Sequence, residues 1–288
     1  MSTVHVLLPV HNRCALTRQF IEDLRLQTFP AVSLLVIDDG SSDGTKDMVL
    51  ELWPQATVLR GDGGLWWAGS LQRGYEHLLR IGAPDTDTVV IANDDTRFQA
   101  DFIARGVRLL SDQPGALLCA QLEDERLGQV RETGVHADLL RFRFRIADVP
   151  SEINCLPTRG LFLRWGDMRR IGGFRPRLLP HYFSDYEYTL RAHRLGYRCL
   201  TDPAVALRAN AQTTGFHDLD RLVGVEFVRR LFSIKTPLNP LHRSAFVLLA
   251  APVLAKLPAL INVWARALLR IVWQGVAHRP FPRRAPGD

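Results

Sequence analysis

The sequence predicts an α/β fold, a doubly wound and mostly parallel sheet with flanking helices, followed by a C-terminal helical, amphipathic tail. Short apolar runs rich in β-branched residues alternate with segments whose apolar residues recur at helical spacing, as in sheets whose strands are joined by crossover helices. The 288 residues, 47% hydrophobic and 23% charged, are enough to bury a large core and have the composition of a globular protein.

Three strands and three helices are expected to alternate in the first part of the chain. The strands are 4–10, 34–37 and 56–59, and the helices are 15–28, 45–52 and 70–79. His11 and Arg13 follow the first strand directly, and Asp38 and Asp39 follow the second. Ligands bind outside the carboxyl ends of the strands in open α/β sheets, so these side chains predict a binding site.

The glycine signatures of two common nucleotide-binding folds are missing. Neither of the first two turns carries G-x-G-x-x-G, and G-x-x-x-x-G-K-[ST] occurs nowhere, so a nucleotide would be held by side chains and a metal ion. The glycine-rich stretch 61–69 contains Trp66 and Trp67, which predicts a close backbone approach to a ligand beside flat apolar surfaces. The alternative is that the two tryptophans fill the core.

A short apolar strand, expected over 88–92, runs directly into Asn93, Asp94 and Asp95. Two adjacent carboxylates at the end of a buried strand repel each other, and burying them unpaired would cost several kcal/mol. A divalent cation removes that conflict, and oxygen-only ligation suits Mg²⁺ or Mn²⁺. Taken alone, the same three residues also fit an acidic, solvated turn.

The second half of the chain continues the alternation less regularly. Helices are expected over 101–110 and 186–195, and strands over 116–120, 141–145 and 160–163. The strand 141–145 alternates arginine with phenylalanine, which indicates a half-buried strand with one arginine face. These arginines could meet an anionic acceptor, but a sheet edge protected by charge is the preferred interpretation.

Two carboxylates stand at the start of the last of these helices. Asp185 lies at the helix start and Glu187 two positions later, so the two side chains diverge instead of sharing one face. Glu187 and Arg191 are spaced for an i,i+4 ion pair, worth at most about half a kcal/mol. The simplest structural role for Asp185 is that of a helix cap.

The excess positive charge lies at the C-terminal end. Residues 241–288 contain seven basic residues and one acid, so they carry the whole net charge of +6. This distribution argues against a nucleic-acid-binding surface, and no nucleic acid is expected as a partner. The segment 244–264 is long enough to span a bilayer, but Lys256, Pro252 and Pro258 disfavour a simple span. Together with 265–277 it favours basic, amphipathic helices lying on an anionic membrane surface. Packing of these helices on the rest of the chain, or in a homodimer, is the alternative.

Cysteine usage and the first residues indicate the compartment. The four cysteines are far apart and show no metal-binding or redox spacing, which suggests reduced thiols. The chain enters a strand within four residues, where a signal peptide would need a longer apolar segment. A cytoplasmic protein, peripheral on the inner face of the cell membrane, is therefore expected.

Four motifs together resemble family 2 glycosyltransferases with the GT-A fold, and most of all the rhamnosyltransferase-like bacterial members. They are VLLPVHNR, VIDDGSSDGT, GDGGLWWAGSLQRGY and VVIANDD, in the order and spacing of that family. The resemblance covers about 4–215. It implies a catalytic domain over 1–215, which binds a nucleotide sugar and an acceptor, and leaves 216–288 as a helical, basic and membrane-associated region.

The resemblance also implies roles for individual residues. Asn93-Asp94-Asp95 would take the place of a DXD-type motif, with Asp95 the better metal ligand and Asp94, also a metal ligand, nearer the ribose. Contacts with the nucleotide are implied for Pro9, His11, Arg13, Asp38, Asp39, Trp67, Gly69 and Asp94. A third metal ligand is sought near Asn210, where relatives supply a histidine; His217 is close by but out of register.

The general base implied by the resemblance is Asp185. The family usually reads Glu-Asp-x-Asp at this point, whereas this sequence has Ser184 in place of the glutamate and Glu187 in place of the second aspartate. The implied activity is inverting transfer of a sugar from a UDP-, dTDP- or GDP-linked donor to a glycan or lipid-linked acceptor, with Mn²⁺ or Mg²⁺, in cell-surface polysaccharide synthesis. A catalytically silent sugar-nucleotide-binding or scaffold protein of the same fold is the alternative.

Overall fold

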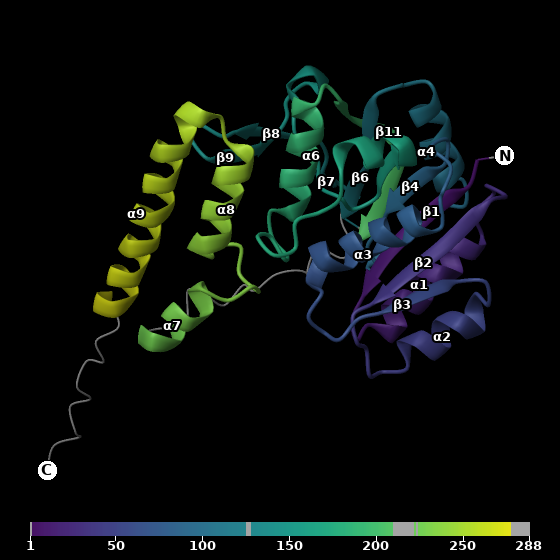
Figure 1. Cartoon of the computed structure of the whole chain (residues 1–288), viewed down its shortest axis with the longest axis horizontal. Helices are drawn as coiled ribbons and strands as arrows, with labels where there is room; N and C mark the ends of the chain where they lie inside the picture. The colour runs from purple at the N-terminus through teal and green to yellow at the C-terminus, as the bar shows by residue number, and fades with distance from the viewer. Residues whose placement is uncertain (1, 125–127, 210–221, 223, 278–288) are drawn as a thin grey trace, which may run out of the picture.

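A computed structural model describes residues 2–124, 128–209, 222 and 224–277. Figure 1 shows a twisted sheet covered by helices, with the C-terminal helices beside it. The strands are β1 Val4–Val10, β2 Val32–Asp38, β3 Thr57–Arg60, β4 Thr88–Ile91, β5 Thr96–Arg97, β6 Ala116–Asp124, β7 Val130–Glu132, β8 Val135–Asp138, β9 Arg143–Ile146, β10 Leu161–Arg164 and β11 Arg198–Ala209. The helices are α1 Cys14–Arg25, α2 Thr45–Leu52, α3 Trp66–Arg80, α4 Phe102–Ser111, α5 Trp165–Ile171, α6 Ser184–Arg194, α7 Gly224–Leu231, α8 Pro240–Ala250 and α9 Val253–Ala277.

The strand order confirms the predicted fold class. Along the main sheet the order is β3-β2-β1-β4-β10-β6-β11-β5, with β7 beside β6, and β8 and β9 form a separate hairpin. The pairs β3–β2, β2–β1, β1–β4 and β6–β11 are parallel, so these six strands run in one direction. The strands β10, β5 and β7 run the opposite way. The sheet is thus mostly parallel, and the carboxyl ends of β1, β2 and β4 meet at one edge.

Both faces of the sheet are buried. In β1, Val6 and Leu8 face the layer that contains Phe20 of α1, whereas Leu7 faces the opposite layer with Trp165 of α5. Strands buried on both faces read as continuous apolar runs, which explains why the sequence of β1 shows no polar alternation.

Several boundaries differ from those expected. Helix α3 begins at Trp66, four residues before the predicted start, so both tryptophans and Gly69 belong to it. Trp66 adopts a φ of 56°, and its N–H is bound by the Asp39 carboxylate 2.9 Å away. This contact with a distant carboxylate fixes the helix start, and local helix propensity gives no signal for it.

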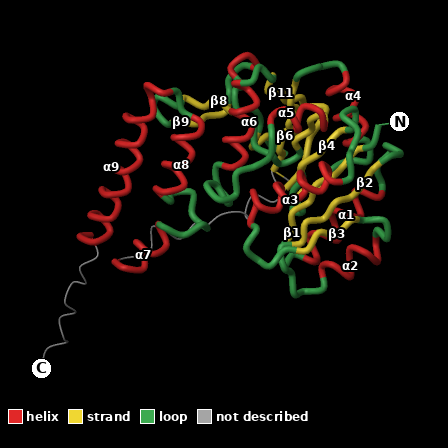
Figure 2. The backbone as a smooth tube through the Cα atoms, in the orientation of Figure 1, coloured by secondary structure: helices red, strands yellow, loops and turns green. Residues whose placement is uncertain are grey.

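The C-terminal helices pack on one another and on the preceding part of the chain. Phe246 and Val247 of α8 are buried with Leu179 and with Leu190 of α6. In Figure 2, α8 and α9 lie beside the β8–β9 hairpin, away from the main sheet. The segment 244–264 is interrupted, because α8 ends at Ala250 and α9 begins at Val253. Among the described residues, we find no helix of the length and hydropathy needed to cross a membrane. The division of the chain near residue 215 stays a prediction.

Candidate functional site

The two carboxylates that follow β4, Asp94 and Asp95, are buried, and the side chain of Arg13 places one positive charge beside them. The Arg13 guanidinium lies 3.0 Å from Asp94 Oδ1 and 3.3 Å from Asp95 Oδ2. Thr17 Oγ1 donates a hydrogen bond of 3.2 Å to Asp94 Oδ2. Burial raises the pKa of Asp94 to about 6; the Arg13 charge opposes this shift, and the neighbouring Asp95 adds to it. The turn is therefore a built electrostatic site and not a solvated loop.

Two oxygens at this turn remain unsatisfied. Asp95 Oδ1 and Asn93 Oδ1 are buried and have no hydrogen-bond partner in the described part of the chain. A hard divalent cation prefers such oxygen donors and is often completed by substrate phosphates, so the residues fit the implied Mg²⁺ or Mn²⁺. No cluster of three or more His, Cys, Asp or Glu suited to a metal occurs among the described residues. Asn210 and His217 lie outside the described residues.

The two aspartates at the end of β2 have different roles. Asp39 Oδ1 accepts hydrogen bonds from the N–H groups of Gly63 (2.9 Å) and Leu65 (3.1 Å), and Oδ2 accepts the one from Trp66. Asp38 Oδ1 accepts a bond from the Ser41 N–H at 2.8 Å, but its Oδ2 is buried without a partner among the described residues. Asp39 thus fastens the glycine-rich loop, whereas Asp38 keeps one oxygen for a ligand.

The glycines of the 61–69 stretch serve this contact. A Cβ on Gly61 would lie 2.6 Å from Asp39 Oδ1, and one on Gly40 would lie 2.8 Å from the Gly63 nitrogen. The sequence predicted that the glycines of 61–69 allow the backbone to approach a ligand. The structure shows that Gly61, together with Gly40 of the facing turn, allows the loop to approach the end of β2. The contact brings α3, with Trp67, to the edge of the sheet.

The loops after β1 and β2 are tied together. His11 Nδ1 lies 2.6 Å from the Asp39 carbonyl oxygen. The Asn12 N–H donates to Ser41 Oγ at 2.9 Å, and Asn12 has a φ of 51°. Pro9 pairs with Ile37 in the sheet register, next to these loops. The structure therefore brings Pro9, His11, Arg13, Asp38, Asp39, Asp94 and Asp95 to one edge, which we call the nucleotide side.

A pocket of about 640 Å³ adjoins this edge at Asn93. This volume suits a small-molecule ligand. Segments from across the chain line it: Trp67, Asn93, Thr133, Val135, Phe144, Arg145, Ile146, Pro157, Thr158, Arg159, His181, Tyr182, Phe183, Asp185, Tyr186 and Pro237. Trp67 is fixed by a hydrogen bond of 3.3 Å from its Nε1 to Thr158 Oγ1. We call this the central pocket; the expected residues Trp67 and Asp185 both line it. Gly69 of α3 does not; a Cβ there would contact Leu65 and Pro176 instead.

Asp185 and Glu187 diverge as the sequence predicted. Glu187 is 1% exposed, and its carboxylate lies 3.0 Å and 3.1 Å from Arg191 nitrogens and 3.5 Å from Arg175. The predicted Glu187–Arg191 pair is therefore confirmed, but it is buried. Ser184, at the position of the family's glutamate, donates from Oγ to the His181 carbonyl oxygen at 2.7 Å. Asp185 is the carboxylate that faces the central pocket.

Sequence reasoning missed several lining residues. Thr158 and Arg159 precede β10, His181 and Tyr182 precede α6, and Pro237 comes from the loop before α8. The sequence offered no signal for Thr158 and Arg159, because the residues before a parallel strand lie at the opposite edge of the sheet. The antiparallel direction of β10 brings these two residues to this edge. Burial lowers the pKa of His181, and the nearby His242 lowers it further. The His181 side chain is therefore neutral at physiological pH.

Comparisons with known proteins agree with this geometry. The model of the family described as Glycosyl transferase family 2 matches residues 5–164. A solved structure of the mannosyltransferase PcManGT from Pyrobaculum calidifontis, in complex with GDP-Man and Mn²⁺, is similar with a TM-score of 0.57 and 20% identity, covering 92% of this chain and 75% of that one. A solved structure of TarS from S. aureus is similar with a TM-score of 0.59 and 15% identity, covering 93% of this chain and 54% of that one. This chain therefore spans about half the length of TarS.

A further TarS structure, of residues 1–349 in complex with UDP-GlcNAc, gives a TM-score of 0.58 at 15% identity, covering 93% of this chain and 73% of that one. At these identities the likeness shows a shared fold. No curated protein is similar enough to count as a match.

Proposed function

Because the chain belongs to glycosyl transferase family 2, we propose that it transfers a sugar from a nucleotide-diphosphate donor to a hydroxyl of a glycan or lipid-linked acceptor. The observation that carries the proposal is the junction at Asn93, where the acidic pair of the nucleotide side meets the pocket that contains Asp185. A donor that spans this junction has its diphosphate beside Asp95 and its sugar in the central pocket.

Each side chain has a task that follows from its surroundings. Asp38 has a buried oxygen without a partner among the described residues, which suits an N–H of the base or a ribose hydroxyl. Asp95 and Asp94 supply carboxylates for a divalent cation, which when bound neutralises charge on the diphosphate. Asp185 accepts the proton of the acceptor hydroxyl as its oxygen attacks the anomeric carbon. Direct attack from the face opposite the leaving diphosphate inverts the anomeric configuration.

Two of the similar structures support the donor class. The mannosyltransferase was solved with GDP-Man and Mn²⁺, and TarS with UDP-GlcNAc. They differ in base and in sugar, so the donor of this chain must be found by experiment. The resemblance to rhamnosyltransferase-like enzymes keeps rhamnose among the sugars to test.

The proposal is tested by thermal unfolding with UDP-, dTDP- and GDP-sugars, each with and without Mn²⁺. A ligand at about 100 times its dissociation constant stabilises by roughly 2.7 kcal/mol, which is readily visible. Slow Mn²⁺-dependent hydrolysis of the stabilising donor is the expected turnover. Stabilisation without any hydrolysis or transfer would favour a silent sugar-nucleotide-binding protein, and no stabilisation by any donor would contradict both functions.

The C-terminal helices support a proposal about location. Helix α9 buries Ala255, Ala259, Val263 and Ala267 on one side and exposes a stripe of large apolar side chains on the other. The members of this exposed stripe are Leu254, Leu257, Ile261, Leu268 and Val272. The helix carries Lys256, Arg266 and Arg270 and no acidic residue. An exposed apolar stripe on a helix that carries basic but no acidic residues suits an anionic membrane surface, where a lipid-linked acceptor for polysaccharide synthesis would lie.

Sedimentation with phosphatidylcholine vesicles, with and without phosphatidylglycerol, tests the membrane contact. Binding is expected only with the anionic lipid, and Leu257→Glu with Ile261→Glu should abolish it. Val225→Glu is the matched control, because Val225 is 87% exposed but lies on α7. If the protein ignores the vesicles and light scattering gives a dimer that the double variant disrupts, the stripe is a homodimer contact.

A further inference from the structure

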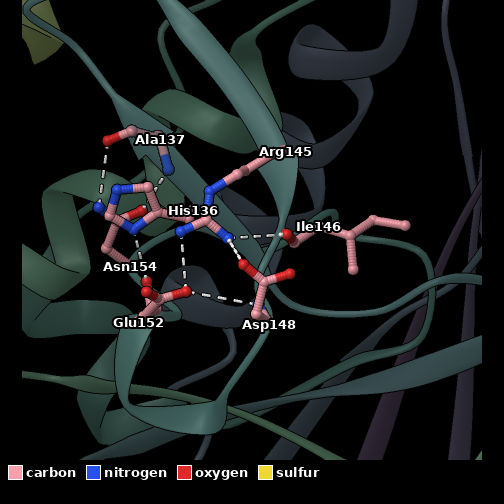
Figure 3. Close-up of polar contacts among 7 residues, drawn as sticks. All are labelled: His136, Ala137, Arg145, Ile146, Asp148, Glu152 and Asn154. Atoms are coloured by element: carbon pink, nitrogen blue, oxygen red, sulfur yellow. Dashed lines mark hydrogen bonds and ion pairs between the residues drawn. The ribbon is translucent and has the colours of Figure 1, made fainter.

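Two arginines line the central pocket, and they differ in how their charge is satisfied. Arg145 of β9 lies 2.7 Å from Asp148 Oδ2 and 2.8 Å from Glu152 Oε2, and it also donates to the Ile146 carbonyl oxygen at 3.2 Å. Figure 3 shows its guanidinium between the two carboxylates. Arg145 is therefore neutralised by the hairpin and the short helical turn that follows it, and it has no need of an anionic ligand.

Arg159 stands in contrast to Arg145. It is half-buried and lines the same pocket, yet its guanidinium makes no hydrogen bond or ion pair with any residue that the structure describes. Taking a guanidinium partly out of water without a counter-charge costs free energy. A ligand that brings an anionic group to this point would recover that cost, and guanidinium matches the geometry of phosphate oxygens.

The backbone fixes the position of Arg159. Strand β10 runs antiparallel to β4 with Leu161 opposite Ile91, and the Gly160 N–H donates to the Ile91 carbonyl oxygen at 2.9 Å. The ladder ends at this pair, and Arg159 and Asn93, which lie just beyond it on the two strands, both line the central pocket. Gly160 has a φ of 72°, and a Cβ there would lie 2.6 Å from Leu207 Cδ1, so this approach requires glycine. Arg159 is thus held beside the residue that precedes the acidic pair.

We propose that Arg159 binds the sugar-bearing phosphate of the donor diphosphate and stabilises the leaving group. This inference rests on the proposed function, which puts the diphosphate at Asp94 and Asp95. In the transfer, the bond from the anomeric carbon to the phosphate oxygen breaks and its electron pair stays on that oxygen. The acceptor oxygen forms the new bond, and its proton goes to Asp185. The negative charge gained by the nucleoside diphosphate develops next to Asn93, where Arg159 stands.

An anionic group on the acceptor is the competing source of the same chemistry, because the pocket also contains Asp185. The position beside Asn93 favours the donor. The two sources predict different results. If Arg159 contacts the donor, its loss weakens the binding of a nucleoside diphosphate without any acceptor present. If it contacts the acceptor, its loss changes only reactions that include the acceptor.

The test compares Arg159→Gln with the control Arg141→Gln in titration calorimetry with Mn²⁺; Arg141 is an exposed arginine that does not line the central pocket. The probe is whichever of UDP, GDP and dTDP the unchanged protein binds most tightly, together with its monophosphate. We expect Arg159→Gln to weaken diphosphate binding about 10–100-fold, as for a lost hydrogen bond to a charged group, and monophosphate binding less than about twofold. Arg141→Gln should change neither, and Arg159→Lys should recover part of the loss.

Three results would overturn the inference, and unchanged thermal unfolding of each variant shows that the fold is intact. Equal loss of monophosphate and diphosphate binding would mean that Arg159 only shapes the pocket. Unchanged diphosphate binding with a raised KM for acceptor would assign Arg159 to the acceptor. Unchanged values throughout would leave it no role in the site. If the unchanged protein binds none of the three diphosphates, the proposed function itself fails, which is a separate outcome.

Discussion

The nucleotide side and the central pocket are built in opposite ways. On the nucleotide side, polar residues follow the ends of three neighbouring parallel strands, and His11 and Asp39 are held by short hydrogen bonds. The central pocket collects residues from α3, β4, the β8–β9 hairpin, the start of α6 and the loop before α8. The first region depends on local sequence and strand order, and the second on how distant segments pack. We therefore expect the two regions to respond differently to mutation.

The largest expected effect separates catalysis from binding. Asp185→Asn keeps the size of the side chain but removes the base, and a general base contributes about 10²–10⁴-fold to rate, or roughly 3–5 kcal/mol of barrier. Donor affinity should be retained, because Asp95 and Arg13 lie on the nucleotide side. Transfer at saturating donor and calorimetry with that donor measure the two quantities. Near-normal turnover in this variant would remove Asp185 from the mechanism.

A change of similar size, but in stability, is expected two residues away. Glu187→Ala removes the carboxylate from Arg191, whose side chain is only 12% exposed, and breaking a buried pair costs about 3–5 kcal/mol. From the i,i+4 spacing alone, the expected contribution of this pair to stability was at most about half a kcal/mol. The spacing does not indicate burial, and Glu187 is only 1% exposed. Urea unfolding measures the loss, and donor affinity per folded molecule is the control. If turnover collapses while stability holds, Glu187 and not Asp185 is the base.

The nucleotide side should show the next effect. Asp95→Asn replaces a carboxylate by a neutral amide, a weaker ligand for a hard cation, and should remove the Mn²⁺-dependent part of donor binding. Thr17→Val removes a hydrogen-bond donor from the neighbouring Asp94, which should raise the pKa of Asp94 further and weaken Mn²⁺-dependent binding less than Asp95→Asn does. Calorimetry with and without Mn²⁺ compares the two variants. Donor affinity that stays Mn²⁺-dependent in Asp95→Asn would contradict the metal site.

The contrast between the nucleotide side and the central pocket also explains which parts of the structure could be predicted from the sequence. The alternation of apolar segments predicted β1, β2 and β4, and the polar residues after them were identified because strand ends are readable locally. The direction of β10 was not predictable, since an apolar run looks the same parallel or antiparallel, and Arg159 owes its position to that direction. The partner of the glycine-rich loop was missed for a related reason: Asp39 lies more than 20 residues away, and only the folded chain shows which of two adjacent aspartates turns inward.

The smallest expected effect concerns the contact between the central pocket and the C-terminal helices. His181 Nδ1 is buried without a hydrogen-bond partner in the described part of the chain, and burial lowers the pKa of both His181 and His242 of α8. Their unfolded pKa is about 6.5, so below that pH the unfolded chain binds more protons than the folded one. The stability that the neutral pair contributes is present above pH 6.5 and is lost as pH falls below it.

The free energy of unfolding should therefore decrease from pH 7.5 to 5.5, by at most about 1.4 kcal/mol per histidine for each pH unit below 6.5. His181→Asn and His242→Asn should each flatten this slope, and their effects should not be additive, because the positive charge of His242 is one cause of the shift at His181. His193→Asn is the control, since His193 is exposed on α6. Urea unfolding at each pH measures the slopes. A slope unchanged in both buried-site variants would mean that other groups, and not the contact between α8 and the pocket, set the response to acid.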